Sequence, residues 1–524
     1  MSAGVARGLG RAHPWWAVGA IVALYATVIA FTAAHHEPWR DEVVPMSFAK
    51  RVASLGELWD VLRYQGHPIL WYLVLRAAYL VFGTTAVMPV ASVVIAVAAV
   101  AVFLACAPLP LWVKALVAFG YFPMFEYSVV ARGNGLAMLL LFGFCALSVR
   151  GGSPIAAAAM LAALANTTVL GFVVAVAAGA MVVVDGLVAR DGVRPAGRHV
   201  VAVIVYLAGL AHVAASNAPG TAVFPAAVGW RDVEPIVTAL GWAIVNPVAH
   251  SAFLYWVPLP GLWLWLFLAL VLRRRPAVVV FALLSLVGFE MIFALVYPAS
   301  PRHGGYVLMV VLATLWLSEV WTWPDAPAPA GRWTRRLLVV PLVVVLGYQI
   351  VLGAGYVVDD VQLDYSSSER LAALIASDRR LDRAIVIGEP EALHQSLPYY
   401  RDNPIYFPQE RAFRDWMWSP WVSFSVASDS TRSLQIGRRA DYDLGELLRT
   451  ATDLRDTHGV PVVMALGWFV DGPQTQRAYV GTWYEQVFTV NPADRDAFLA
   501  ATQLLGRLRS ASFTDENYDV FVLW

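Results

Sequence analysis

Long apolar stretches dominate the first two thirds of the chain. Runs of 17 or more nearly uncharged residues recur from Trp15 to about Tyr356 and then stop. A helix needs about 20 apolar residues to cross about 30 Å of hydrocarbon, so these runs predict about 11 or 12 membrane-spanning helices. The expected spans are about 15–34, 67–83, 86–106, 108–124, 134–149, 154–187 (two helices), 200–216, 257–272, 277–297, 304–321 and 337–356.

A different pattern begins after the last of these spans. Short strand-like runs alternate with helix-like ones, which is typical of a small α/β domain. The predicted fold class is therefore a polytopic α-helical membrane protein, with a membrane module over 1–356 and a C-terminal soluble α/β domain over 357–524. The strand-like runs are 384–387, 460–466 and 520–523, and the helix-like runs are 367–378 and 493–509.

A charged loop, 35–66, separates the first two expected spans. Apolar residues recur in it at helical spacing between charged ones, which predicts an amphipathic helix over 43–64 that lies on the membrane surface. The apolar positions are Val44, Phe48, Val52, Leu55, Leu58 and Leu62.

Clusters of arginine in short loops predict the orientation. Arg190, Arg194 and Arg198 form one such cluster, and others lie at 7–11, 273–275 and 332–336. Such loops are expected in the cytoplasm, which places the C-terminal domain outside it. If every expected span crosses the membrane, counting from the N-terminus places residue 190 on the side opposite to the one that its arginine cluster predicts. One helix within 67–124 or 236–256 is therefore miscounted or re-entrant.

Composition narrows the class of protein further. The chain is 59% hydrophobic and 14% charged, with zero formal net charge, whereas soluble domains carry about a quarter charged residues. No basic run with interleaved aromatics is present, which excludes a nucleic-acid partner. Cys106 and Cys145 lie in apolar segments without metal-ligand spacing. The usage rich in Ala, Val and Arg favours a high-GC bacterium, and hence its cytoplasmic (inner) membrane.

Polar residues at the ends of expected spans are the candidates for chemistry. Asp41 and Glu42 close the motif Pro38-Trp39-Arg40-Asp41-Glu42 after the first span, and His67 begins the motif 67–72 that opens the second. Two adjacent carboxylates at a membrane surface are costly to desolvate unless something binds there. One of them could act as a general base toward a hydroxyl. The alternative is a solvated charge pair that helps to set the topology.

These motifs, together with Tyr127-Ser128-Val129-Val130-Ala131-Arg132 and the 297–304 segment with Arg302 and His303, resemble the GT-C glycosyltransferases. The resemblance covers about 15–356 and is to the branch of the dolichyl-phosphate-mannose protein mannosyltransferases and lipid A aminoarabinose transferases. Val130 stands where that family has a glutamate, and Ile69 where it has a second proline. Glu126 could replace the missing carboxylate if the segment is helical, because positions i and i+4 share a face.

The resemblance implies a glycosyltransferase. It would move a mannose-like hexose or arabinose-like pentose from a polyprenyl-phosphate donor, among the membrane lipids, to an extracytoplasmic glycan, lipid or protein. Transfer would be a single displacement with inversion. Asp41 would be the base, and Glu42 would orient it or bind the acceptor. Arg132, Arg302 and His303 would bind the donor phosphate, because its negative charge needs cationic partners.

Other residues are candidates for substrate binding: His67, Tyr127, Glu126 and Glu290. The candidates have structural alternatives as well. Arginines can extend their charge to the membrane interface, histidines can cap helix ends, and tyrosines often line membrane interfaces. An intramembrane glutamate is expensive unless it is paired or lines a cavity. A divalent cation, Mg or Mn, could bridge carboxylate and phosphate, but the pattern indicates no ligand set.

Two other classes of function remain open from the sequence. A transporter or flippase could use Glu290 and Arg76 to line a path, although no internal repeat is visible. An assembly protein that binds through its soluble domain would leave Asp41, His67 and Arg302 without a shared role. Five tryptophans of that domain favour either an aromatic core or a sugar-stacking groove; they are Trp416, Trp418, Trp421, Trp468 and Trp483.

Overall fold

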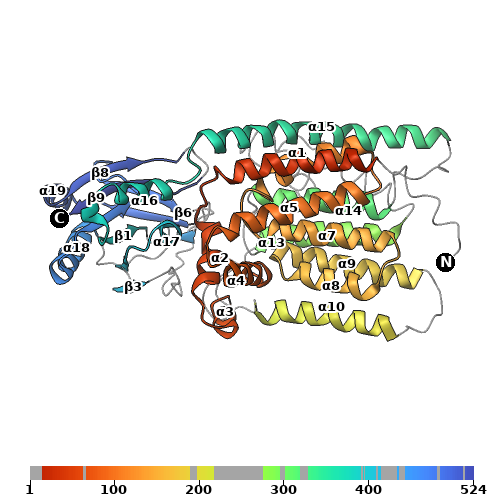
Figure 1. Cartoon of the computed structure of the whole chain (residues 1–524), viewed down its shortest axis with the longest axis horizontal. Helices are drawn as coiled ribbons and strands as arrows, with labels where there is room; N and C mark the ends of the chain where they lie inside the picture. Colours follow the sequence, from red (N-terminus) through yellow and green to blue (C-terminus); the bar gives the residue numbers. More distant parts are fainter. Residues whose placement is uncertain are drawn as a thin grey trace.

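The protein has a bundle of roughly parallel helices at one end and an α/β domain at the other (Figure 1). The computed structural model describes residues 14–62, 67–188, 197–216, 275–295, 301–318, 328–390, 394, 396–408, 411–414, 434–435, 443–480, 484–510 and 514–524.

Six helices of the described part are long and apolar enough to cross a membrane. This agrees with the predicted polytopic fold, and the expected pair of helices within 154–187 is observed. The expected span 257–272 lies outside the described residues. The long helices are α1 (Trp15–Ala33), α5 (Val87–Cys106), α9 (Val169–Val188), α10 (Gly197–Ser216), α13 (Pro276–Leu295) and α15 (Ala328–Gln362). Shorter elements complete the bundle: α6 (Leu111–Ala118), η2 (Phe122–Glu126), α7 (Asn134–Val149), α8 (Pro154–Ala165) and α14 (Gly304–Ser318).

The bundle buries apolar residues inside and exposes others on its outer face. Every residue of α14 is buried, so this helix lies at the centre. Along α10, by contrast, Val203, Ile204 and Leu207 are exposed. Large apolar side chains on the outside of a helical bundle are stable when lipid rather than water surrounds them.

Helix α4 (Leu70–Phe82) does not cross the bundle, and the expected span 67–83 is wrong. Its first residue, Leu70, donates a backbone hydrogen bond to the Asn166 carbonyl at the end of α8. Trp71 and Leu75 pack in one cluster with Val87, the first residue of α5. The helix therefore begins and ends at the same end of the bundle, beside the 35–66 loop. At about 20 Å it is also shorter than the hydrocarbon layer.

This correction removes the parity conflict in the predicted topology. When α4 is not counted as a membrane crossing, α1 runs toward the 35–66 loop and α5, the next crossing, runs away from it. Two basic residues of the described part, Lys114 and Arg275, then lie at the opposite end, where they donate to the Leu104 and Leu317 carbonyls respectively. Arg150 and Arg198 flank that same end, because they lie at the end of α7 and the start of α10.

The amphipathic stretch of the first loop forms two helices, not one. Helix α2 (Arg40–Arg51) and helix α3 (Leu55–Leu62) are separated by a break at Val52. Met46 packs with Trp71 of α4, while Phe48 packs with Leu58 of α3. The apolar face predicted for the membrane surface is therefore covered largely by neighbouring helices.

The C-terminal domain has a six-stranded mixed sheet of order β3-β2-β1-β5-β9-β8. Strand β1 runs parallel to both neighbours, and apolar clusters cover both faces, beneath α16 and α18 respectively. The strands of this sheet are β1 (Ile385–Glu389), β2 (Ile405–Phe407), β3 (Ala412–Arg414), β5 (Val462–Leu466), β8 (Gln503–Leu508) and β9 (Tyr518–Leu523). A second sheet contains β4 (Leu434–Gln435), β7 (Tyr484–Thr489) and β6 (Thr475–Val480), and the helical elements are α16 (Ser368–Ala376), η6 (Arg379–Leu381), α17 (Leu397–Tyr400), α18 (Leu444–His458) and α19 (Pro492–Ala501).

Candidate functional site

Asp41 lies in the first turn of α2 and joins two arginines from distant segments. Arg132 comes from the turn before α7, and Arg302 from the short helix η4 (Pro301–His303) before α14. The Asp41 Oδ2 atom accepts hydrogen bonds from Arg132 Nη1 at 2.5 Å and from Arg302 Nη1 at 2.8 Å. The structure thus brings together the predicted base and two of the three predicted phosphate ligands.

The charges of this cluster hold Asp41 in its ionised form. Burial would raise the pKa of Asp41, but the neighbouring Arg132, Arg302 and Arg40 guanidinium groups hold it well below its usual range. The side chains of Asp41, Arg132 and Arg302 remain 25%, 17% and 23% exposed, so an approaching molecule can reach them. Two arginines against one carboxylate leave an excess of positive charge, which suits an anionic ligand.

Glu42 has a different environment from its neighbour. Its side chain is fully buried, and it accepts hydrogen bonds from the Ala131 backbone N–H at 2.6 Å and pairs with His36 Nε2 at 3.0 Å. The other ring nitrogen of His36 lies 2.8 Å from Asp360 Oδ1 on α15. The hydrogen bond between Glu42 and Ala131 thereby joins the segment of Asp41 to the segment of Arg132. Of its two expected roles, orienting Asp41 fits this geometry, whereas contact with an acceptor needs exposed surface.

His36 completes a buried charge network that the sequence pattern did not indicate. Burial would lower the pKa of His36, but the carboxylates of Glu42 and Asp360 outweigh it and raise the pKa to about 10. The positive ring therefore lies between the two carboxylates and offsets part of their negative charge. His36 follows the first span directly, which was the available signal, but nothing in the sequence connects it with Asp360.

The two histidine candidates, His67 and His303, both have lowered pKa values. His303 stacks on Phe293 with ring centroids 5.4 Å apart, and burial and the Arg302 charge lower the pKa of His303 well below its usual value. A neutral imidazole can still donate an N–H to a phosphate oxygen, so the role of His303 in binding the donor phosphate stays a prediction. His67 has an accessible ring, yet the protein atoms around it and the Arg132 charge lower its pKa to about 4.

Tyr127 and Glu126 lie beside the cluster, each in a supporting contact. The Tyr127 hydroxyl donates to the Arg302 carbonyl at 2.7 Å, which fixes the η4 turn. Glu126 is buried and accepts a hydrogen bond from the Tyr121 hydroxyl at 2.8 Å. Because η2 ends at Glu126, the helical spacing that would let it replace a carboxylate at position 130 is absent.

Two charged residues expected inside the membrane occupy separate places. Arg76 of α4 donates to the Ala49 carbonyl at 2.8 Å, so it anchors the end of α2. Glu290 lies partly buried in α13, the helix that precedes η4.

The described residues around Asp41 do not fit a divalent cation. Mg²⁺ and Mn²⁺ prefer several oxygen ligands, whereas the groups on Asp41 Oδ2 are two guanidinium groups. Among the described residues, no group of three or more His, Cys, Asp or Glu side chains forms a metal-binding cluster.

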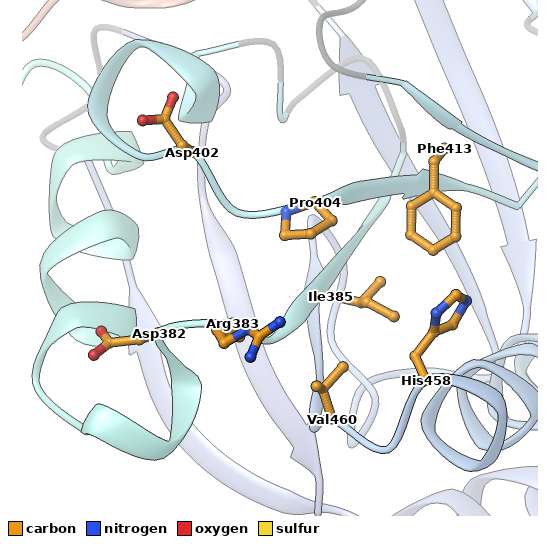
Figure 2. Close-up of a pocket in the computed structure, with 8 residues that line it drawn as sticks. All are labelled: Asp382, Arg383, Ile385, Asp402, Pro404, Phe413, His458 and Val460. Atoms are coloured by element: carbon orange, nitrogen blue, oxygen red, sulfur yellow. The ribbon is translucent and has the colours of Figure 1, made fainter.

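The C-terminal domain contains a cavity of about 480 Å³ (Figure 2). Ile385, the first residue of β1, lines it together with Arg383, Phe413 and His458, and the last two rings contact edge to face at 5.3 Å. The opposite end of β1, at Glu389, lies about 13 Å away at 3.3 Å per residue. The cavity is therefore separate from the Asp41 cluster.

Of the five tryptophans in this domain, the structure describes Trp468. It is buried in the apolar cluster under α18, as a core residue is. Trp416, Trp418, Trp421 and Trp483 lie outside the described residues.

Comparisons with known proteins give matches to solved structures alone. No protein-family model and no curated protein sequence matches the chain. The crystal structure of ArnT from Cupriavidus metallidurans bound to undecaprenyl phosphate is 15% identical, with a TM-score of 0.47, and the match covers 96% of this chain and 97% of that chain. The apo crystal structure of the same protein is 16% identical, with the same TM-score and coverage.

Proposed function

We propose that this chain is a membrane glycosyltransferase of the GT-C type, which transfers a hexose or pentose from a polyprenyl-phosphate donor to an extracytoplasmic acceptor. The observation that carries the proposal is the convergence of Arg132 and Arg302 on Asp41. The motif resemblance supports it, because all three residues belong to motifs shared with that family.

The two arginines are the binding site for the donor phosphate. Guanidinium groups bind phosphate oxygens through paired, charge-assisted hydrogen bonds. Arg132 and Arg302 lie just before the helices α7 and α14, at the same end of the bundle. A polyprenyl chain can therefore stay in the lipid while its phosphate reaches both groups. The same charges stabilise the lipid phosphate as it leaves.

Asp41 is the general base of the transfer. In the ligand-free state its ion pairs make it a weak base. A bound phosphate competes for the same guanidinium groups, and as they turn toward it the proton affinity of Asp41 rises. Asp41 then takes the proton of the acceptor hydroxyl, whose oxygen forms the new bond to the sugar. The bond from the sugar to the phosphate breaks, and the lipid phosphate leaves with that electron pair.

The Asp41 cluster and the C-terminal domain lie outside the cytoplasm in this proposal, in a bacterial inner membrane. The support is the distribution of basic residues. Lys114, Arg150, Arg198 and Arg275 lie at the end of the bundle away from Asp41, and such residues favour the cytoplasmic side. The arginines near Asp41 are different, because they are paired with carboxylates.

The proposal is tested by following donor consumption in lipid nanodiscs. Synthetic polyprenyl-phosphate hexoses and pentoses are supplied with acceptors extracted from a bacterial envelope, and released lipid phosphate is measured. Arg132→Lys and Arg302→Lys should each slow release about 10²-fold, since lysine loses the paired geometry at a charge-stabilising site. Arg150→Lys is the matched control, because Arg150 is exposed at the other end of α7, about 24 Å away.

Equal rates for all three variants would show that the arginine pair does not bind the donor. A wild-type protein that consumes no donor, yet moves a lipid-linked or polar solute across vesicles, would replace the proposal with transport.

A further inference from the structure

Arg40, directly before Asp41, donates two hydrogen bonds to the C-terminal domain, and its Nε atom lies 3.8 Å from Asp41 Oδ1. Its backbone N–H donates to Glu516 Oε1 at 2.9 Å, and its Nη2 atom donates to Asp515 Oδ2 at 3.0 Å. Arg40 is 6% exposed, and Glu516 is fully buried. Neighbouring residues in the sequence, Arg40 and Asp41, are thus held by different domains.

Glu516 is the centre of a buried polar junction. It accepts hydrogen bonds from the hydroxyls of Ser366, Ser368 and Ser396, the last at 2.6 Å. A buried carboxylate is costly unless its oxygens are paired, so these contacts fix the position of Glu516. Because one of its oxygens receives the Arg40 N–H, they fix the start of α2 as well.

Further contacts hold the segment just before Arg40. The Tyr400 hydroxyl donates to the Pro38 carbonyl at 2.8 Å, and the Ser366 backbone N–H donates to Glu37 Oε2 at 3.2 Å. The loop from Glu37 to Arg40 is therefore bound along its length by the domain. Figure 1 shows this domain against the end of the bundle where α2 lies.

The junction occupies a part of the sheet where open α/β domains usually bind ligands. Strands β1 and β5 end side by side at Glu389 and Leu466, and Leu466 pairs with Asp519, close after Glu516. Ligands of such domains bind outside the carboxyl ends of the strands, where the strand order reverses. Strand β1 is that point here, because β2 and β5 flank it. The chain's own first loop covers this edge.

We propose that the C-terminal domain is a positioning element for Asp41, with Arg40 and Glu516 as its positioning residues. The inference rests on the proposed transfer reaction for its effect on rate, but not for the docking itself. Release of Arg40 frees the first turn of α2 and so displaces the adjacent carboxylate. A misplacement of about 1 Å at a reacting group lowers a rate about 10²-fold.

The test compares Glu516→Ala and Glu516→Gln in the full-length protein. Asp471→Asn is the control, because it removes a carboxylate of the same domain from an exposed ion pair with Arg507. Hydrogen–deuterium exchange of the 36–44 backbone reports docking, and kcat and donor KM report transfer. Glu516→Ala should speed exchange about tenfold, since a charge-assisted hydrogen bond is lost. It should lower kcat about 10²-fold with little change in donor KM.

Glu516→Gln keeps an oxygen that can accept the Arg40 N–H, so it should restore most of the protection and of kcat. Asp471→Asn should change neither. Tyr400→Phe, which removes one hydroxyl at the junction, should shift both readouts in the same direction by a smaller factor.

Unchanged exchange in Glu516→Ala and Tyr400→Phe would overturn the docking. Faster exchange with wild-type kcat would overturn the positioning role. If Glu516→Ala exchanges faster but the wild-type protein never transfers sugar, the docking stands and the proposed function is rejected.

Discussion

Replacement of Asp41 by asparagine should separate donor binding from transfer. Asp41→Asn keeps the shape of the side chain but removes its charge and its basicity. In the ligand-free protein Asp41 pairs with Arg132 and Arg302, so a phosphate that binds to these arginines must compete with Asp41. The variant should therefore bind lipid phosphate more tightly than the wild type while it transfers sugar more slowly.

The magnitudes follow from the two hydrogen bonds on Asp41 Oδ2. A charge-assisted hydrogen bond contributes about 1.5–3 kcal/mol, but all three side chains are partly exposed and solvent screens part of this. A net gain of about 1.4 kcal/mol corresponds to about tenfold tighter binding of undecaprenyl phosphate. Loss of a general base should slow transfer about 10²–10⁴-fold.

Both quantities are measurable on the same nanodisc preparation. Equilibrium binding uses labelled undecaprenyl phosphate, and single-turnover transfer uses the matching phosphate sugar. Asp471→Asn provides the control for loss of one carboxylate. Weaker binding by Asp41→Asn would refute the competition between Asp41 and phosphate, and transfer at the wild-type rate would refute the base.

Two further predictions concern the buried network around Glu42. Glu42→Gln should destabilise the protein by about 2–4 kcal/mol, because it removes one member of a buried ion pair; denaturant unfolding in detergent measures this, and unchanged stability would contradict the assigned contacts. The pKa of His36 is raised from 6.5 to about 10, so its stabilising charge is fully present below pH 6.5 and is lost as the pH rises through 10. Thermal unfolding of the wild type and His36→Gln should accordingly differ most below pH 6.5 and converge above pH 10; a constant difference across this range would show that His36 does not titrate as described.

The site was partly visible in the sequence. Asp41, Arg132 and Arg302 belong to recognisable motifs, and the structure places them together. The contacts of their sequence neighbours, Arg40 and Glu42, could not be predicted from the sequence. Glu42 follows Asp41 in the chain, but the turn of α2 directs it inward to His36. Arg40 meets Asp515 and Glu516 from a domain that no motif connected with it.

The sequence by itself determined where most of the membrane helices lie, because length and hydropathy are local properties that decide whether a segment can cross lipid. The tertiary structure decided what local patterns cannot. The apolar α4 remains at one end because α2 packs on it and Arg76 bonds the end of α2. The ion pairs of Asp41 join residues 91 and 261 positions apart. Such contacts depend on the path of the whole chain, since the energy of a buried charge is set by the groups that surround it and not by its sequence neighbours.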